Sequence, residues 1–573
     1  MEESKTILHN LVAPQSGKME ETMKKIISII LVVLMLLSMV ACGNTNQPAN
    51  NQTEQTENTQ NQSGDALTTA ANAYFAEFPG NRITNWEDVF ALIDAGDAPY
   101  ILSIRQAKDY DTEHIKGAFN AAWGEDLSSK LAILPKDKPV YVYCYTGQTA
   151  GQAVAIMNML GIEAYSLKGG INNGAKKIEG YEKYIETTKN ELVDAKAEFD
   201  KSILEFAQKY FIDVVNNANF MMGSPDVDVF ASTGDIKIVD IRQAQDFEAA
   251  HIEGAVNIPF GKGMQEKFVD LPKDKKLVVA CYSGQTAGQT VAVLRALGYD
   301  ALSLQSGMTG GYAPYVVKKE AAKYFAEYPG NRMISWEDLL AKIDAGENPY
   351  ILSIRQQKDY DAGHVKGAVL AAWGDDLAAK ISMLPTDKPV YVYCYTGQTA
   401  GQAVALMNMM GIEAYSVTSG FANGLSKIEG YEKYVDTVAV EMANSGATFN
   451  PYVKTYVENY FKAIATGGNN IIELDQILPL VESGKATVID IRKAEDFALG
   501  HVKGAINIPF GKGMQESFDA KVLPQGKLIV ACYSGQTAGQ ATAILRAMGF
   551  DAVSMKSGMK NGWEANNLPV VTD

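Results

Sequence analysis

Four cysteines stand in nearly identical segments along the 573-residue chain, at Cys144, Cys281, Cys394 and Cys532. Each segment reads Cys-Tyr, then Thr or Ser, then Gly-Gln-Thr, and continues with Ala-Gly-Gln. A cysteine thiolate is a strong nucleophile, so a cysteine that recurs in one polar, glycine-containing setting indicates covalent chemistry. The alternative is a small, buried, apolar residue, which is the usual state of a free cysteine. The shared setting favours the nucleophile.

The residues on either side of each segment predict the elements that position the cysteine. An apolar run precedes it, as in Val140 to Tyr143, and small and apolar residues with helical spacing follow it, as in Ala153 to Leu160. The unit is therefore a buried strand, a short loop and a helix, with the cysteine at the carboxyl end of the strand. Free N–H groups and the dipole of the helix N-terminus favour a thiolate there and would hold an oxyanion or a terminal sulfur anion. Gly147 permits the tight winding of the loop.

The other loop residues are candidates for substrate binding. The threonine that ends each loop either contacts a ligand or merely caps the helix. The tyrosine forms a pocket rim or only shields the loop, and the glutamine binds a ligand or faces solvent. The four cysteines are the predicted catalytic residues, and the predicted substrate-binding residues are Tyr145, Thr146, Gly147, Gln148, Thr149, Tyr282, Ser283, Gly284, Gln285, Thr286, Tyr395, Thr396, Gly397, Gln398, Thr399, Tyr533, Ser534, Gly535, Gln536 and Thr537.

These residues resemble a known family. The pattern Cys-x-x-Gly-x-Thr is similar to the active loop of rhodanese (thiosulfate sulfurtransferase) domains. Two further motifs match. One is Asp240-Ile241-Arg242, which recurs at 490–492, and the other runs from Asp246 to Ala255 and recurs, with its His-x-x-Gly-Ala ending, in all four copies. The motifs follow one another in fixed order through most of the chain.

The resemblance implies a sulfurtransferase. A loop thiolate would take the outer sulfur of thiosulfate or a similar donor as a cysteine persulfide and pass it to a thiol or to cyanide, with no metal or organic cofactor. Two other functions stay open. A phosphatase-like relative would need a longer loop that ends in Arg, whereas these loops contain no basic residue. A sulfur-carrier or partner-binding module without turnover would have the same sequence.

The copies depart from the family pattern in two ways. A tyrosine follows every cysteine where the family often has Arg, and Ser103 and Ser353 stand where the other two copies have the Asp of Asp-x-Arg. The resemblance assigns the histidine of the third motif to a structural turn and not to a catalytic base. We also expect each motif arginine to pair with the aspartate four residues later, as Arg105 with Asp109.

Composition limits the classes of function. The apolar fraction of 47% supports full cores, and the net charge of −16 gives no sign of nucleic-acid binding, which usually needs a basic surface. The fifth cysteine is Cys42. The chain has no Cys-x-x-Cys pair and no histidine at metal-ligand spacing from a cysteine, so we predict no metal site.

The N-terminal region predicts export. Lys24 and Lys25 precede an apolar stretch from Ile26 to Ala41, as in a signal peptide, and this stretch is short for a membrane-spanning helix. It ends in Met-Val-Ala-Cys-Gly, which resembles the lipobox of bacterial lipoproteins, so Cys42 would be the lipidated first residue of the mature protein. The polar segment that follows indicates a flexible tether. The predicted location is extracytoplasmic, anchored to the bacterial cell membrane through lipid; an ordinary cleaved signal or an anchor helix is the alternative.

The repeats predict the domain organisation. Copies one and three are nearly identical and copies two and four share the segment from Ile258 to Glu266, so a two-domain unit of about 250 residues is duplicated in tandem. Trp123 and Trp373 take the matching place in copies one and three, so we expect two kinds of pocket. The predicted boundaries are a signal peptide with an upstream extension (1–42), a disordered tether (43–66), domain one (67–188), a linking helix with domain two (189–318), domain three (319–438), and a linking helix with domain four (439–573).

The predicted fold class is α/β, with each domain a parallel sheet flanked by helices on both faces. In copy one the patterns predict a helix over 85–93 and strands over 100–104, 140–143 and 163–167. The charged segments 189–216 and 441–465 have apolar residues at helical spacing, and we expect them to pack domain against domain.

Overall fold

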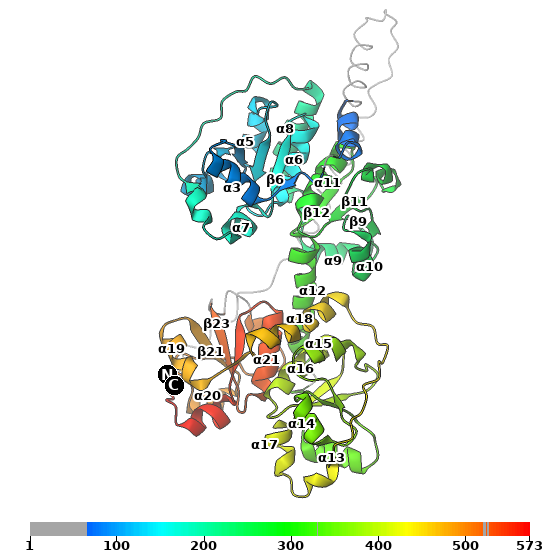
Figure 1. Cartoon of the computed structure of the whole chain (residues 1–573), viewed down its shortest axis with the longest axis vertical. Helices are drawn as coiled ribbons and strands as arrows, with labels where there is room; N and C mark the ends of the chain where they lie inside the picture. Colours follow the sequence, from blue (N-terminus) through cyan, green and yellow to red (C-terminus); the bar gives the residue numbers. More distant parts are fainter. Residues whose placement is uncertain (1–65, 79, 329, 519–522, 524–525, 573) are drawn as a thin grey trace, which may run out of the picture. The chain divides into compact units, whose positions relative to one another are not determined.

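A computed structural model describes residues 66–78, 80–328, 330–518, 523 and 526–572. The predicted signal peptide, Cys42 and most of the tether lie outside these residues. Within the described ranges the chain forms four α/β domains, each built on a five-stranded parallel sheet, which confirms the predicted fold class (Figure 1). No helix in this part of the chain is both long and apolar enough to cross a membrane.

Domain one has the sheet order β1-β6-β5-β2-β4. The predicted strands are present within one residue, whereas the edge strands β1 and β4 are two residues long and have too little pattern to be predicted. A short antiparallel pair joins β3 to β7 beside the sheet. The elements are β1 (Ile83–Thr84), α3 (Trp86–Ala95), β2 (Tyr100–Ser103), α4 (Ala107–Thr112), β3 (His114–Ile115), β4 (Phe119–Asn120), α5 (Glu125–Lys130), β5 (Val140–Tyr143), α6 (Gln148–Met159), β6 (Ala164–Leu167), α7 (Gly170–Asn173) and β7 (Ile185–Glu186).

The other three domains repeat this strand order. Domain two contains β8 (Met221–Met222), α9 (Ser224–Thr233), β9 (Ile236–Asp240), α10 (Ala244–Ala249), β10 (Val256–Asn257), β11 (Lys276–Ala280), α11 (Gln285–Ala296) and β12 (Ala301–Leu304). Domain three contains β13 (Met333–Ile334), α13 (Trp336–Asp344), β14 (Tyr350–Ser353), α14 (Gln357–Ala362), β16 (Val369–Leu370), α15 (Asp375–Lys380), β17 (Val390–Tyr393), α16 (Gln398–Met409) and β18 (Ala414–Val417). Domain four contains β20 (Ile471–Ile472), α19 (Leu474–Glu482), β21 (Ala486–Asp490), α20 (Ala494–Leu499), β22 (Ile506–Asn507), β23 (Lys527–Ala531), α21 (Gln536–Ala547) and β24 (Ala552–Met555).

The central strand β5 separates two cores. Its alternate residues Val140 and Val142 face a core that also contains Val239 and Val279 of domain two, so domains one and two share one hydrophobic interior. Tyr143 faces the opposite way, into a smaller core formed with α3 and α7. This period of two is the ordinary geometry of a strand that is buried on both faces. Cys144 continues the alternation and belongs to the shared core.

Helices are exchanged between the domains of each pair. Helix α8 (Lys201–Asn216) leads into domain two, yet its Phe211 packs edge-on against Trp123 of domain one, with ring centroids 5.3 Å apart. In return, Phe75 in the helix over 66–76 packs against Phe260 of domain two at 5.6 Å. The corresponding helices of the second pair are α12 (Ala313–Ala326) and α18 (Pro451–Gly467).

The linking helices therefore pack domain against domain, as predicted, but they start later than predicted. Residues 191–200 have no regular structure, and α8 begins only where the side chain of Asp200 accepts hydrogen bonds from the N–H groups of Ser202 and Ile203. Such a cap satisfies N–H groups that have no partner within the helix and so fixes where the helix begins. Asn450 caps α18 in the same way, with Pro451 at its first position.

Candidate functional site

Each of the four cysteines directly follows the central strand of its sheet, as the sequence predicts. In domain one the loop ends at Gly147, the N-cap of α6, whose φ of 95° lies in the left-handed region that favours glycine. The Gly147 N–H group donates to the Cys144 Sγ over 3.0 Å, and the equivalent glycines of the other loops do the same. In domains two and four a second N–H group, from Ala287 and Ala538, donates to the sulfur over 3.3 Å. The backbone thus directs hydrogen-bond donors at the position where negative charge on sulfur would lie.

A tight turn after β6 packs against the backbone of the cysteine loop and supports it. The N–H groups of Ile171 and Asn172 donate to the carbonyl oxygens of Cys144 and Tyr145, over 3.0 and 2.9 Å. Gly170 lies so close that a Cβ there would stand 2.6 Å from the Cys144 oxygen. This support recurs in every domain, at Gly307, Gly420 and Gly558. The glycine turn, which the sequence showed only as the end of a strand, is therefore part of the site.

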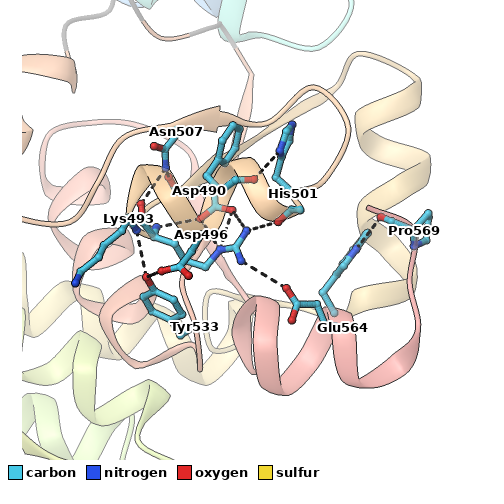
Figure 2. A network of polar contacts seen from close by, with 12 residues as sticks. Asp490, Lys493, Asp496, His501, Asn507, Tyr533, Glu564 and Pro569 are labelled. Atoms are coloured by element: carbon cyan, nitrogen blue, oxygen red, sulfur yellow. Dashed lines mark hydrogen bonds and ion pairs between the residues drawn. The ribbon is translucent and has the colours of Figure 1, made fainter. Parts of the chain in front are cut away.

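The tyrosine after each cysteine connects the loop to the helix that follows the motif arginine, which is α4 in domain one. The Tyr145 hydroxyl donates to Asp109 Oδ2 over 2.5 Å and accepts the N–H of Gln106 at 3.2 Å. Its burial, and next its hydrogen bond to Asp109, raise the pKa of Tyr145, so the phenol stays protonated as a donor. The ring of Tyr395 is 38% exposed, which places this tyrosine at the rim of the site. Tyr282, Tyr395 and Tyr533 bond the matching aspartates Asp246, Asp359 and Asp496 (Figure 2 shows domain four).

The expected pairing of each motif arginine with the aspartate four residues later is wrong, because that aspartate holds the tyrosine. In domain two Arg242 pairs instead with Asp240, two residues before it, with Nη2 and Oδ2 2.7 Å apart. The Arg242 Nη2 also donates to the Ala250 carbonyl oxygen over 2.5 Å. Burial alone would lower the pKa of Arg242, but the hydrogen bond and the charge of Asp240 outweigh it and raise the pKa. Arg492 and Asp490 form the same pair in domain four.

In domains one and three no aspartate stands two residues before the buried arginine, so this ion pair does not form. Ser103 takes the place of the aspartate, and the residue beside it on β5 is Tyr143, where domain two has Ala280 beside Asp240. Arg105 is only 3% exposed; its Nη2 donates to the Glu113 carbonyl oxygen, and its Nε has no hydrogen-bond partner in the described part of the chain. The guanidinium carbon lies 5.6 Å from the centre of the Tyr143 ring. A cation–π contact replaces the ion pair.

The histidine of the third motif holds a turn, as the resemblance implied. In domain one both ring nitrogens of His114 lie near carbonyl oxygens, Nδ1 2.7 Å from that of Tyr110 and Nε2 2.9 Å from that of Thr188. The ring is fully buried and stacks on Tyr110 at 3.7 Å. These contacts occupy the groups that a general base would need.

The glutamines of the four loops do not face solvent. Gln148 is 3% exposed, and its Nε2 donates to the Ser303 Oγ and the Leu304 carbonyl oxygen of domain two, over 2.8 and 2.9 Å. Its Oε1 accepts the N–H of Ser306 at 3.0 Å. The threonine that ends each loop is half-exposed, and because glycine is the N-cap, this threonine does not cap the helix. Substrate contacts by these residues stay a prediction.

A cavity of about 340 Å³ opens beside the loop of domain four. Tyr533, Ser534 and Thr537 of the loop line it, together with Lys493, which is a glutamine in the other three domains. The segment that leads into domain three closes it with Tyr328, Asn331 and Met333. The site of one domain is therefore completed by residues that belong to its neighbour.

Each of the four domains is similar in sequence to known proteins. The family model "Rhodanese-like domain" matches residues 85–177, 226–313, 335–427 and 473–566, well over half of the chain. The thiosulfate sulfurtransferase GlpE of Actinobacillus pleuropneumoniae is 31% identical over 100 residues, which cover 17% of this chain and 88% of that protein. Rhodanese-like domain-containing protein 15 of Arabidopsis thaliana is 34% identical over 92 residues, 14% of this chain, and the chain spans 50% of that relative's length. A thiosulfate sulfurtransferase structure from Pseudomonas aeruginosa aligns over 86% of this chain and 90% of its own, with 16% identity and a TM-score of 0.18.

Proposed function

Because the chain belongs to the rhodanese-like domain family, we propose that it is a sulfurtransferase that moves a sulfane sulfur from thiosulfate or a similar donor to a thiol or cyanide. The observation that carries this proposal is the recurring contact between each cysteine Sγ and the N–H of the glycine at the helix start. The relative GlpE, which this chain matches over 88% of its length, is named a thiosulfate sulfurtransferase.

The reaction is a double displacement. The loop thiolate attacks the outer sulfur of thiosulfate, a bond forms between the two sulfurs, and sulfite leaves with the electron pair of the broken S–S bond. The cysteine then carries a persulfide whose terminal sulfur is negative. An acceptor thiolate or cyanide attacks that sulfur, and the cysteine departs as the thiolate, ready for another donor. The N–H groups around the loop stabilise the sulfur anion at both steps.

The surroundings of the loop fit small anionic sulfur donors. In domain four, the cavity beside the loop that follows Cys532 brings Lys493 and the loop hydroxyls of Ser534 and Thr537 to one space. A lysine attracts an anion without fixing its orientation, which suits a compact donor such as thiosulfate. The hydroxyls add neutral donors.

A second function, the carrying of sulfur without turnover, is favoured by one observation. All four cysteines are only 2% exposed, so a bound persulfide would be shielded from solvent. A carrier would load sulfur from thiosulfate but release it to cyanide slowly or not at all.

The test is thiocyanate formation from thiosulfate and cyanide by the reduced full chain, beside a variant with all four loop cysteines changed to serine. The proposed enzyme turns over many times, and the quadruple variant is inactive. Loading of one sulfur per loop without turnover supports the carrier. If the reduced protein shows neither sulfur loading nor turnover, both functions are contradicted and a partner-binding module remains.

We also propose that Cys42 is lipidated and anchors the protein to the outer face of a bacterial membrane. The support is the lipobox-like sequence that precedes it. Labelling of the full chain with a fatty acid in bacteria, with Cys42→Ser as the control, tests this. Equal labelling of both proteins would contradict it.

A further inference from the structure

The helices that follow the paired loops pack against each other at their first turns. A Cβ at Gly151 of α6 would stand 2.2 Å from the Gln285 carbonyl oxygen, and one at Gly288 of α11 would stand 2.5 Å from that of Gln148. No other residue type permits such an approach without displacement of backbone. The Ala-Gly-Gln that continues every loop therefore marks a close contact between the two loops of a pair.

At this contact each loop gives a glutamine to the other domain. Gln285, the residue after the glycine of the Cys281 loop, places its amide in domain one. Its Nε2 donates to the Ser166 Oγ over 2.7 Å and to the Leu167 carbonyl oxygen over 3.2 Å, and its Oε1 accepts the N–H of Gly169 at 3.2 Å. The side chain is 3% exposed, so loss of these bonds would leave buried polar groups unpaired.

The residues that Gln285 holds are those that support the Cys144 loop. Leu167 and Gly169 lead directly into Gly170, which packs against that loop, and into Ile171, whose N–H donates to the Cys144 carbonyl oxygen. The Cys281 loop is thus connected to the Cys144 loop through the Gln285 side chain and the turn that follows β6. A displacement of the Gln285 side chain would therefore shift the turn that contacts the Cys144 loop.

The reverse path exists as well. Gln148 follows Gly147, the residue that donates to the Cys144 Sγ, and its amide holds Ser303 and Ser306 of domain two. The turn after Ser306 supports the other loop, because the N–H of Met308 donates to the Cys281 carbonyl oxygen over 2.8 Å.

The second pair of domains repeats both contacts. Gln536 donates to the Ser416 Oγ over 2.5 Å and to the Val417 carbonyl oxygen over 3.1 Å, and Gln398 donates to the Ser554 Oγ over 2.8 Å and to the Met555 carbonyl oxygen over 2.9 Å. A contact formed four times with these distances is a property of the pair.

We propose that these glutamines are positioning residues for the cysteine of the neighbouring domain, so that the two loops of a pair control each other's reactivity. Gln285 positions Cys144 and Gln148 positions Cys281. Where it concerns sulfur transfer, the proposal rests on the proposed function; where it concerns thiol reactivity, it does not. Because one glutamine runs in each direction between the two loops, each loop acts on the other.

The test uses two backgrounds of the full chain, one that retains Cys144 and one that retains Cys281 as its only loop cysteine. Gln285→Ala and Gln148→Ala are placed in both. Two rates are measured on the peptide that carries the cysteine: persulfide formation from thiosulfate, and alkylation by iodoacetamide, which needs no sulfurtransferase activity. Gln245→Ala, at an exposed glutamine on α10 of domain two, is the matched control.

The expected pattern is crossed. Gln285→Ala slows both reactions of Cys144 more than those of Cys281, Gln148→Ala does the reverse, and the larger effect reaches about tenfold to a hundredfold, since a displacement of about 1 Å at reacting groups can cost this much. Larger effects on each glutamine's own loop, or equal effects on both, overturn the proposal. Gln285→Met and Gln148→Met keep the side-chain volume and remove the hydrogen bonds, so they repeat the test if the alanine variants fail to fold. Crossed alkylation without persulfide formation would support the coupling and contradict the proposed function alone.

Discussion

The cysteine loops of all four domains have nearly the same sequence, but domains one and three differ from domains two and four in the strand residues beside the buried arginine. We call the first kind the Ser/Tyr domains, after Ser103 and Tyr143, and the second the Asp/Ala domains, after Asp240 and Ala280. In the Asp/Ala domains a carboxylate neutralises the buried arginine, whereas in the Ser/Tyr domains an aromatic ring contacts it. Two neighbouring strand positions therefore differ together, so that a smaller side chain on one strand is balanced by a larger one on the next.

The difference also changes the charge near the cysteines. The guanidinium carbon of Arg105 lies 6.0 Å from the ring centre of Tyr145, a residue of the loop that carries Cys144. No aspartate stands two residues before Arg105 in the sequence. The Asp/Ala domains add a carboxylate beside the arginine and direct a second N–H group at the sulfur. The four sites therefore differ in the charge and in the N–H groups that lie near the cysteine sulfur.

The largest expected effect comes from breaking the ion pair of an Asp/Ala domain. Asp240→Ser leaves the Arg242 charge buried and unpaired, because the neighbouring Ala280 offers no ring. We expect the local free energy of unfolding to fall by about 3–5 kcal/mol. Hydrogen exchange of the β9 amides measures this. Ser103→Ala, the matched change in a Ser/Tyr domain, should cost about 1 kcal/mol or less, and equal losses would contradict the comparison.

Conversion of one domain kind into the other should need both positions. Ser103→Asp alone forces a carboxylate beside the fully buried Tyr143 and should destabilise domain one by about 1–3 kcal/mol. The double variant Ser103→Asp with Tyr143→Ala reproduces the pair of domain two and should recover most of this loss. Hydrogen exchange of β2 and β5 reports both values. A double variant less stable than Ser103→Asp would show that the two positions do not compensate.

Removal of the tyrosine hydroxyl should affect both kinds of domain alike. Tyr145→Phe and Tyr282→Phe each break the hydrogen bond to the aspartate that holds the loop, so persulfide formation at the adjacent cysteine should slow about three- to tenfold. Burial and the aspartate raise the pKa of both tyrosines, so the phenol's contribution is complete below its unfolded pKa of about 10 and is lost only as the pH rises through the higher folded value. Wild-type and phenylalanine profiles should therefore run parallel from pH 7 to about 10. A wild-type rate that falls to the level of the phenylalanine variant within this range would contradict the assignment.

The smallest effect concerns a single site. Lys493→Gln gives domain four the residue found in the other three domains, and at low salt it should raise the KM for thiosulfate at Cys532 by about two- to fivefold. The comparison variant Gln243→Lys in domain two should lower the KM for thiosulfate at Cys281 by a similar factor. A change in kcat with constant KM would show that the lysine acts on the reaction and not on attraction of the donor.

The sequence was sufficient to predict the inner strands of the sheets and the place of the cysteines, because the apolar strands such as Val140 to Tyr143 and the glycine loops are local patterns. It could not show which domain covers which helix, since apolar residues at helical spacing show that α8 buries one face but do not name the domain that the face contacts. The roles of Gln148 and Gln285 were missed for a related reason: a polar residue in a loop looks solvent-exposed until its partner domain is placed. The helical glycine Gly151 was the available signal, because glycine is unfavourable within a helix unless something packs closely against it.

The arginine partner shows the limit of spacing arguments. Asp109 lies four residues after Arg105, which suggests a pair on one helix face, but α4 begins only at Ala107. Arg105 stands before that helix, so the rule for helical neighbours does not apply. The aspartate is then free to hold Tyr145, the residue by which this chain departs from the family pattern.

The most direct test of sulfur transfer is the mass of each of the four loop peptides after the reduced full chain meets thiosulfate. The account predicts one added sulfur on Cys144, Cys281, Cys394 and Cys532, removable by cyanide with release of thiocyanate, and none in the variant with four serines. Absence of added sulfur at all four cysteines of fully reduced, folded protein would contradict the account.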